Sequence, residues 1–245
     1  MSIELCVLSF FLYSFFGWLY ESTICSLLKQ KRFINRGFLT GPWCPIYGCG
    51  AMMCCLLLSS IENSIILFIA ASIVCSILEY ITGYGMEKLF HAKWWDYSQY
   101  PFNLNGRICL YGATLFGVVS VVVCKVVQPK FIELLRNIDF IILMFIAILL
   151  CVIFVFDIVV TLRNWADFNI HLKNMHEMFL SKIQPNIIAN KNGLEIWVSD
   201  KKMQFKKKEL RFLHAFPKLK IKSHEKIMLK IEMRNHIKNI FGKRF

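Results

Sequence analysis

Residues 138–162 decide the fold of this chain, and they read IDFIILMFIAILLCVIFVFDIVVTL. Only Asp139 and Asp157 carry a charge in this stretch. A helix that crosses the ~30 Å hydrocarbon core of a bilayer needs about 20 predominantly apolar residues. The stretch therefore predicts a transmembrane helix.

Four more apolar spans precede it, at residues 5–28, 41–60, 64–80 and 108–127. The second is the weakest, because glycines and prolines crowd its first half, and such an entrance is typical of a broken or re-entrant segment. Lipid offers no hydrogen bonds to an unpaired backbone, so each span must be helical. We expect an all-α polytopic membrane bundle with about five transmembrane helices.

The composition agrees with a membrane protein. Hydrophobic residues make up 56% of the 245 residues and charged residues 18%, whereas roughly 45–50% apolar content is usual in soluble domains. The net charge of +13 is unevenly placed: residues 1–162 hold 10 basic and 9 acidic side chains, and residues 163–245 hold 19 and 7. The sequence thus predicts a transmembrane domain over 1–162 and a basic, helical cytoplasmic tail over 163–245.

Basic residues also predict the orientation, because they favour the cytoplasmic side of short loops. The loop after the first span and the loop before the fourth are rich in lysine and arginine, whereas the short loop between them has only Glu62. This pattern predicts a plasma-membrane protein with its N-terminus outside and its tail in the cytoplasm.

Polar residues crowd the span ends that this orientation places on the cytoplasmic side. Ionisable groups near hydrocarbon are costly, and such a cluster indicates a binding site. Arg36 and Arg107 are the expected partners of the deeper Glu21 and Glu79. The predicted site consists of Glu21, Asn35, Arg36, Glu79, Glu87, Trp95, Asp96, Asn105 and Arg107.

The order of these groups repeats faintly in two hairpins. Glu21 with residues 35–37 and 46–51 corresponds to Glu79 with residues 105–107 and 110–113. Spans one and three run the same way, so this would be a parallel repeat. The same residues also allow a structural interpretation, in which the charges only fix the bundle.

As a set, these motifs resemble the type IV ABC-transporter permease family. The resemblance covers roughly residues 8–160 and also residues 213–220 of the tail. It implies a small multi-pass bacterial membrane protein with a role in transport. The chain has no G-x-x-x-x-G-K-[ST] phosphate loop, so such a role needs a separate ATPase subunit.

Other partners follow from the remaining sequence. Five spans are few for a complete transport pathway, so a homo-oligomer or larger assembly is expected, surrounded by membrane lipids. Residues 223–241 alternate apolar and basic side chains, which favours binding to anionic lipid or a partner protein over nucleic acid.

The sequence gives little support for an enzyme. The ten cysteines show no C-x-x-C pair and the histidines no ligand spacing, so no metal or cofactor is expected. An enzyme acting on lipid headgroups could use Glu21, Glu79 or Asp96 as acid or base, but the sequence shows no nucleophile for it. The alternatives that stay open are this lipid-headgroup protein and a structural or regulatory membrane protein.

Overall fold

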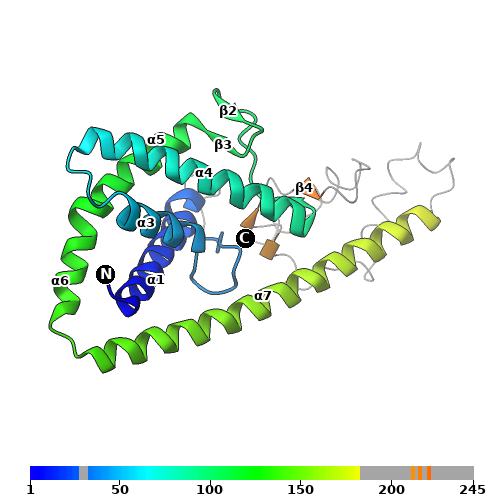
Figure 1. Cartoon of the computed structure of the whole chain (residues 1–245). Helices are drawn as coiled ribbons and strands as arrows, with labels where there is room; N and C mark the ends of the chain where they lie inside the picture. Colours follow the sequence, from blue (N-terminus) through cyan, green and yellow to red (C-terminus); the bar gives the residue numbers. More distant parts are fainter. Residues whose placement is uncertain (28–32, 183–210, 213–214, 217–219, 222–245) are drawn as a thin grey trace.

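The computed structural model describes residues 1–27, 33–182, 211–212, 215–216 and 220–221 (Figure 1). The predicted basic helix at 223–241 lies outside these residues. The helices are α1 (Ile3–Tyr20), α3 (Pro45–Leu57), α4 (Ser64–Phe90), α5 (Leu110–Val122), α6 (Gln128–Arg136) and α7 (Phe140–Lys182), with π-helical turns η1 (Glu21–Cys25) and η2 (Val123–Val127). The strands are β1 (Ala92–Lys93), β2 (Asn103–Leu104), β3 (Ile108–Cys109) and β4 (Lys220–Ile221).

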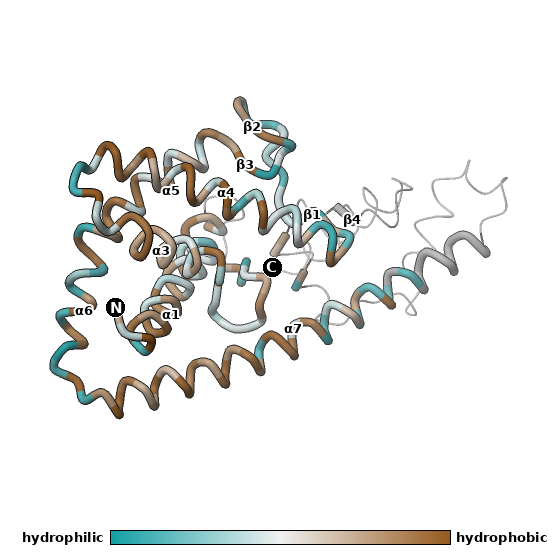
Figure 2. The backbone as a smooth tube through the Cα atoms, viewed as in Figure 1, coloured by the Kyte–Doolittle hydropathy of each residue, from teal (hydrophilic) through white to brown (hydrophobic). Residues whose placement is uncertain are grey.

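Within the described residues, four helical segments are long and apolar enough to cross a membrane. They are Ile3–Cys25, Ser64–Phe90, Leu110–Arg136 and Phe140–His171. Their residues are largely hydrophobic, as the brown stretches along the tube in Figure 2 show. The predicted all-α membrane bundle is confirmed.

The second predicted span forms a shorter helix than the sequence suggested. Helix α3 has 13 residues, or about 20 Å at 1.5 Å per residue, and it begins only at Pro45. A proline favours the first helical position because its missing N–H needs no partner there. Residues 41–44 before it are not helical, so the glycines and prolines do break the entrance to this span.

Glycines let the helices approach closely in two pairs, α1 with α3 and α4 with α5. A Cβ atom on Gly48 of α3 would lie 2.6 Å from the backbone oxygen of Phe10 in α1. One on Gly117 of α5 would lie 2.8 Å from the ring of Phe68 in α4. Small residues at such contacts are typical of membrane helix packing, where backbones meet without a hydrophobic driving force.

Helix α7 runs the length of the molecule and continues beyond residue 162 without a break (Figure 1). Near its start, Leu143 and Ala147 pack with Leu8 of α1 and Leu135 of α6. Farther along, Trp165 and Phe168 belong to an aromatic cluster with Ala92, Trp94 and Phe212. Between these contacts most of its apolar side chains are exposed.

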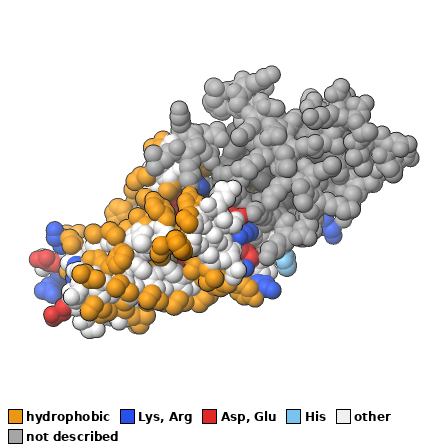
Figure 3. Space-filling model, turned by 90° about the horizontal axis from the view of Figure 1, so that it is seen from above, with side chains coloured by type: hydrophobic (Ala, Val, Ile, Leu, Met, Phe, Trp, Pro, Cys, Tyr) orange, Lys and Arg blue, Asp and Glu red, His pale blue; other side chains and the backbone are white. Residues whose placement is uncertain are grey.

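Charged side chains gather at the ends of the helical part. In Figure 3 hydrophobic side chains spread over the visible face, with lysine, arginine and acidic groups mainly at its two ends. An apolar band bounded by charged ends is the surface that a bilayer requires.

The two loops that carry the predicted site are the first loop (residues 33–44) and the third loop (residues 91–109).

Candidate functional site

The shortest ion pair in the described part of the chain ties the third loop to α4. Arg107 Nη2 lies 2.9 Å from Glu87 Oε2, and its Nε donates to Oε1 at 3.2 Å. Its Nη1 donates to the Tyr80 hydroxyl at 3.1 Å, and the guanidinium lies over the rings of Tyr80 and Tyr84. The hydrogen bonds to Glu87 raise the pKa of Arg107 above its ordinary value. Arg107 therefore pairs with Glu87, and not with Glu79 as the sequence suggested.

Three more predicted residues, Trp95, Asp96 and Asn105, form contacts within the third loop beside this pair. The Trp95 indole donates to the Arg107 carbonyl at 2.9 Å. Lys93 Nζ lies 3.1 Å from Asp96 Oδ1 and donates to the Asn105 carbonyl at 3.1 Å. Asn105 has a φ of 54°, in the left-handed region that asparagine tolerates better than most residues. These contacts hold the loop in one shape.

A second group lies where α1 ends. Glu21 begins the π-helical turn η1 and accepts a hydrogen bond from the Tyr47 hydroxyl at 2.8 Å. Arg36 Nε lies 3.9 Å from Glu21 Oε2, in a pair that is partly open to solvent. Asn35 accepts from the Trp18 indole at 2.9 Å. The sequence suggested Arg36 as a candidate partner of Glu21 or Glu79, and in the structure it lies beside Glu21. π-helical turns often occur at functional sites.

Glu79 is the deepest predicted residue, with 5% of its surface exposed. The Tyr97 hydroxyl donates to its Oε1 at 3.1 Å, while its Oε2 has no partner among the described residues. Burial raises the pKa of Tyr97 well above its ordinary value, and the charges of Glu79 and Glu21 raise it further. The Tyr97 hydroxyl therefore ties the third loop to Glu79, and the charge of Glu21 also acts on it.

Helix α7 contacts the first loop through residues that the pattern of charges did not single out. The backbone N–H of Gly41 lies 2.9 and 3.0 Å from the two oxygens of Asp157. The Thr161 hydroxyl accepts from the Thr40 N–H at 3.0 Å. A Cβ on Gly41 would lie 2.9 Å from Asp157, so only glycine fits this contact without a shift. The sequence feature that could have identified Asp157 is its charge within an otherwise apolar stretch.

Arg211, from the tail, also forms hydrogen bonds to the first loop. It donates to the carbonyls of Gly37, Phe38 and Leu39 at 3.2, 2.8 and 2.8 Å. Burial lowers its pKa from the ordinary arginine value, and the charge of Asp157 opposes that shift. The neighbouring Phe212 is fully buried in the aromatic cluster. Tail, first loop and α7 therefore meet at one place.

We expect Asp157→Ala to lower the free energy of unfolding by about 2 kcal/mol, because it leaves the Gly41 N–H without its acceptor. Asp157→Asn keeps an acceptor oxygen and should cost less. Thermal unfolding of the purified protein in detergent measures both. Glu133→Gln, at an exposed position of α6, is the control and should change nothing. A wild-type midpoint for Asp157→Ala would show that this contact does not hold α7.

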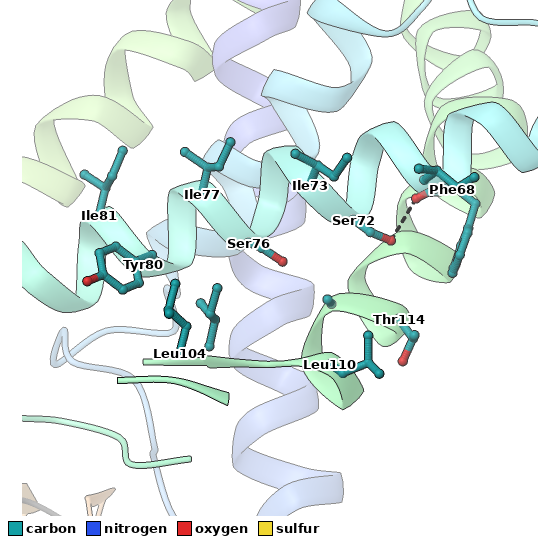
Figure 4. Close-up of a pocket in the computed structure, with 13 residues that line it drawn as sticks. Phe68, Ser72, Ile73, Ser76, Ile77, Tyr80, Ile81, Leu104, Leu110 and Thr114 are labelled. Atoms are coloured by element: carbon teal, nitrogen blue, oxygen red, sulfur yellow. Dashed lines mark hydrogen bonds between the residues drawn. The ribbon is translucent and has the colours of Figure 1, made fainter. Parts of the chain in front are cut away.

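An apolar groove of about 540 Å³ lies between α4 and the start of α5 (Figure 4). Isoleucines of α4 and Leu110 line it together with the hydroxyls of Ser72, Ser76 and Thr114. None of the predicted site residues line it. Its link to the polar cluster is Tyr80, which lines the groove and accepts from Arg107.

The structure thus brings the predicted residues into two connected groups, and their role as a binding site stays a prediction. The tyrosines Tyr47, Tyr80 and Tyr97 were missed, because aromatic residues at a membrane interface carry no specific signal. No group of three or more histidine, cysteine or acidic side chains suited to a metal occurs in the part of the chain that the structure describes.

Comparison with known proteins gives one match. Residues 8–162, well over half of the chain, match the family described as "Putative ABC-transporter type IV". No curated protein and no solved structure matches. The resemblance predicted from the sequence motifs is confirmed over this range.

Proposed function

The chain belongs to this ABC-transporter family, and from that premise we propose that it is a permease-like subunit that binds its ligand at the polar cluster. That it is a membrane protein of a transporter-like kind follows from the family and its apolar helices. The observation that carries the finer proposal is the gathering of Glu21, Arg36, Glu79, Glu87 and Arg107 where α1 and α4 meet the first and third loops. Ionisable groups at such a depth mark substrate or ion pathways in membrane proteins.

The basic residues of the first and third loops support an orientation with the cluster at the cytoplasmic face. A ligand would then enter or leave the pathway where a cytoplasmic ATPase subunit could act on it. The chain has no phosphate-binding loop of its own, so coupling to ATP requires that second subunit.

We expect the tagged chain, extracted from its native membrane in mild detergent, to co-purify with an ATPase subunit. Mass spectrometry of the purified sample identifies the partner. ATP hydrolysis by the purified complex then tests whether this partner is an active ATPase. A sample extracted from cells that lack this ATPase gene is the control. Recovery of a strict monomer without any partner would contradict the proposal.

Arg36 offers a way to separate binding from folding. Its pair with Glu21 spans 3.9 Å and Glu21 is 30% exposed, so solvent screening leaves it worth less than about 1 kcal/mol. Arg36→Gln should therefore fold like the wild type, with an unchanged thermal midpoint, yet alter ATP hydrolysis by the complex. A variant that fails to fold would favour the structural interpretation of this pair.

Lipid-headgroup binding is a second candidate, favoured by the apolar groove beside Tyr80. An acyl chain in this groove would place a headgroup near Arg107. Native mass spectrometry with added phosphatidylglycerol tests it: the wild type should retain the lipid, and Ser76→Leu, which fills the groove, should not.

A further inference from the structure

The buried carboxylates of the described residues differ in how their charges are balanced. They are Glu79, Glu87, Asp96 and Asp157. Glu87 pairs with Arg107 and Asp96 with Lys93, while Asp157 binds a backbone N–H and feels the charge of Arg211. No lysine or arginine among the described residues lies within 4 Å of Glu79. One buried negative charge is thus left over.

The surroundings of Glu79 leave one of its oxygens free. Oε1 accepts from Tyr97, but Oε2 is fully buried without a hydrogen-bond partner among the described residues. Oε2 faces the first turn of α5, where a Cβ on Gly112 would lie 3.9 Å away. The Gly112 N–H does not reach it, because that N–H donates to Cys109 Sγ. A buried polar atom without a partner indicates an unseen water, ion or proton.

The groups that interact with Glu79 carry oxygen atoms: the Tyr97 hydroxyl donates to its Oε1 at 3.1 Å. The charges of Glu21 and Glu79 both act on the Tyr97 hydroxyl, and Glu21 brings the Tyr47 hydroxyl with it. Arg36 offsets the charge of Glu21. The group is therefore one positive charge short of neutral. Carboxylate and hydroxyl oxygens are the ligands of hard cations, and a divalent ion would overcompensate the charge.

We infer that Glu79, with Tyr97 and Glu21, binds one alkali-metal cation inside the membrane domain. The inference rests on the proposed function in placing a ligand at the polar cluster, and it names the chemical class of one ligand. It requires no ATPase partner, since every group involved belongs to this chain. Failure to find an ATPase would therefore not contradict the cation site. Failure to find the cation would likewise not contradict an association with an ATPase.

The test is thermal unfolding of the purified full chain in detergent, with NaCl or KCl replacing choline chloride at constant ionic strength. Choline carries a bulky quaternary ammonium that cannot coordinate Glu79 Oε2, which is fully buried. At about ten times the dissociation constant, the bound cation should raise the midpoint by about 3–6 °C. Glu79→Gln should abolish this rise and Glu133→Gln should keep it.

Gly112→Ala provides a second variant that need not disturb folding. Its methyl group would lie 3.9 Å from Glu79 Oε2, so it would crowd a cation bound to that oxygen. Gly85→Ala is the matched control, because a Cβ there meets nothing within 4 Å. Loss of the sodium or potassium effect in Gly112→Ala but not in Gly85→Ala supports the site.

Three results would overturn the inference. One is an equal rise of the midpoint when the concentration of choline chloride alone is increased, which would make the effect one of ionic strength. Another is a rise that survives in Glu79→Gln. The third is the absence of any cation effect in the wild type, in which case a proton neutralises Glu79. Equilibrium binding of ²²Na⁺ should give one cation per chain in the wild type and none in Glu79→Gln.

Discussion

Arg107→Ala should destabilise the protein by about 3 kcal/mol, one of the two largest effects that the structure predicts. The change removes the arginine that pairs with Glu87, a carboxylate that is 6% exposed. Breaking a buried ion pair costs 3–5 kcal/mol because the remaining charge stays uncompensated, and the lower end applies because the Arg107 side chain is 14% exposed. Thermal unfolding in detergent gives the loss.

The double variant Arg107→Ala, Glu87→Gln separates the charge from the packing. It should recover part of the lost stability, because the amide carries no charge to bury. Arg107→Lys should be intermediate, since lysine cannot bind both carboxylate oxygens in a planar fork. If the double variant were no more stable than Arg107→Ala alone, the uncompensated charge would not be the cause.

Gly48→Ala should separate α1 from α3 and cost about 1–3 kcal/mol, the usual penalty of overpacking. The added Cβ would clash with Ser14 Oγ and lie 2.6 Å from the Phe10 backbone oxygen. A backbone atom cannot move aside as a flexible side chain can, so one of the helices must shift. A lower thermal midpoint is the expected result.

Gly50→Ala is the matched control in the same helix. Its Cβ would meet only Leu78 and Cys75, at 3.6 and 3.7 Å, and alanine favours a helix over glycine by about 1 kcal/mol. This variant should be as stable as the wild type or more so. Equal losses in both variants would mean that the close approach at Gly48 is not the cause of the loss.

The amino-acid sequence was sufficient for the all-α membrane bundle. Hydrophobic length fixes a membrane helix almost regardless of context, but the second predicted span, rich in glycine and proline, forms a helix of only 13 residues. Arg36 and Arg107 were candidate partners of Glu21 and Glu79, and the sequence did not say which pairs would form. Glu79 and Glu87 share one face of α4 at a spacing of eight residues, so helix geometry alone could not tell which of them Arg107 meets. Just before Arg107, the chain passes through a left-handed backbone conformation at Asn105, and sequence spacing does not encode such a conformation.

Contacts between distant segments were the part that could not be predicted. Asp157 meets Gly41 and Arg211 meets the carbonyls of residues 37–39 across more than a hundred residues of chain. Backbone groups are the partners in both cases, and a backbone N–H or carbonyl looks the same at every position of a sequence. Only the folded path of the first loop shows which of them are free to bind.

Helix α7 makes the protein sensitive to the thickness of its bilayer. It is fastened near its start to α1 and α6 and farther along to the first loop and the aromatic cluster, while side chains such as Ile141, Phe145 and Phe156 face outward. A membrane thinner or thicker than this exposed length produces hydrophobic mismatch, which a helix relieves by tilting. Because α7 is held at both places, that tilt must pull on the Asp157 contact.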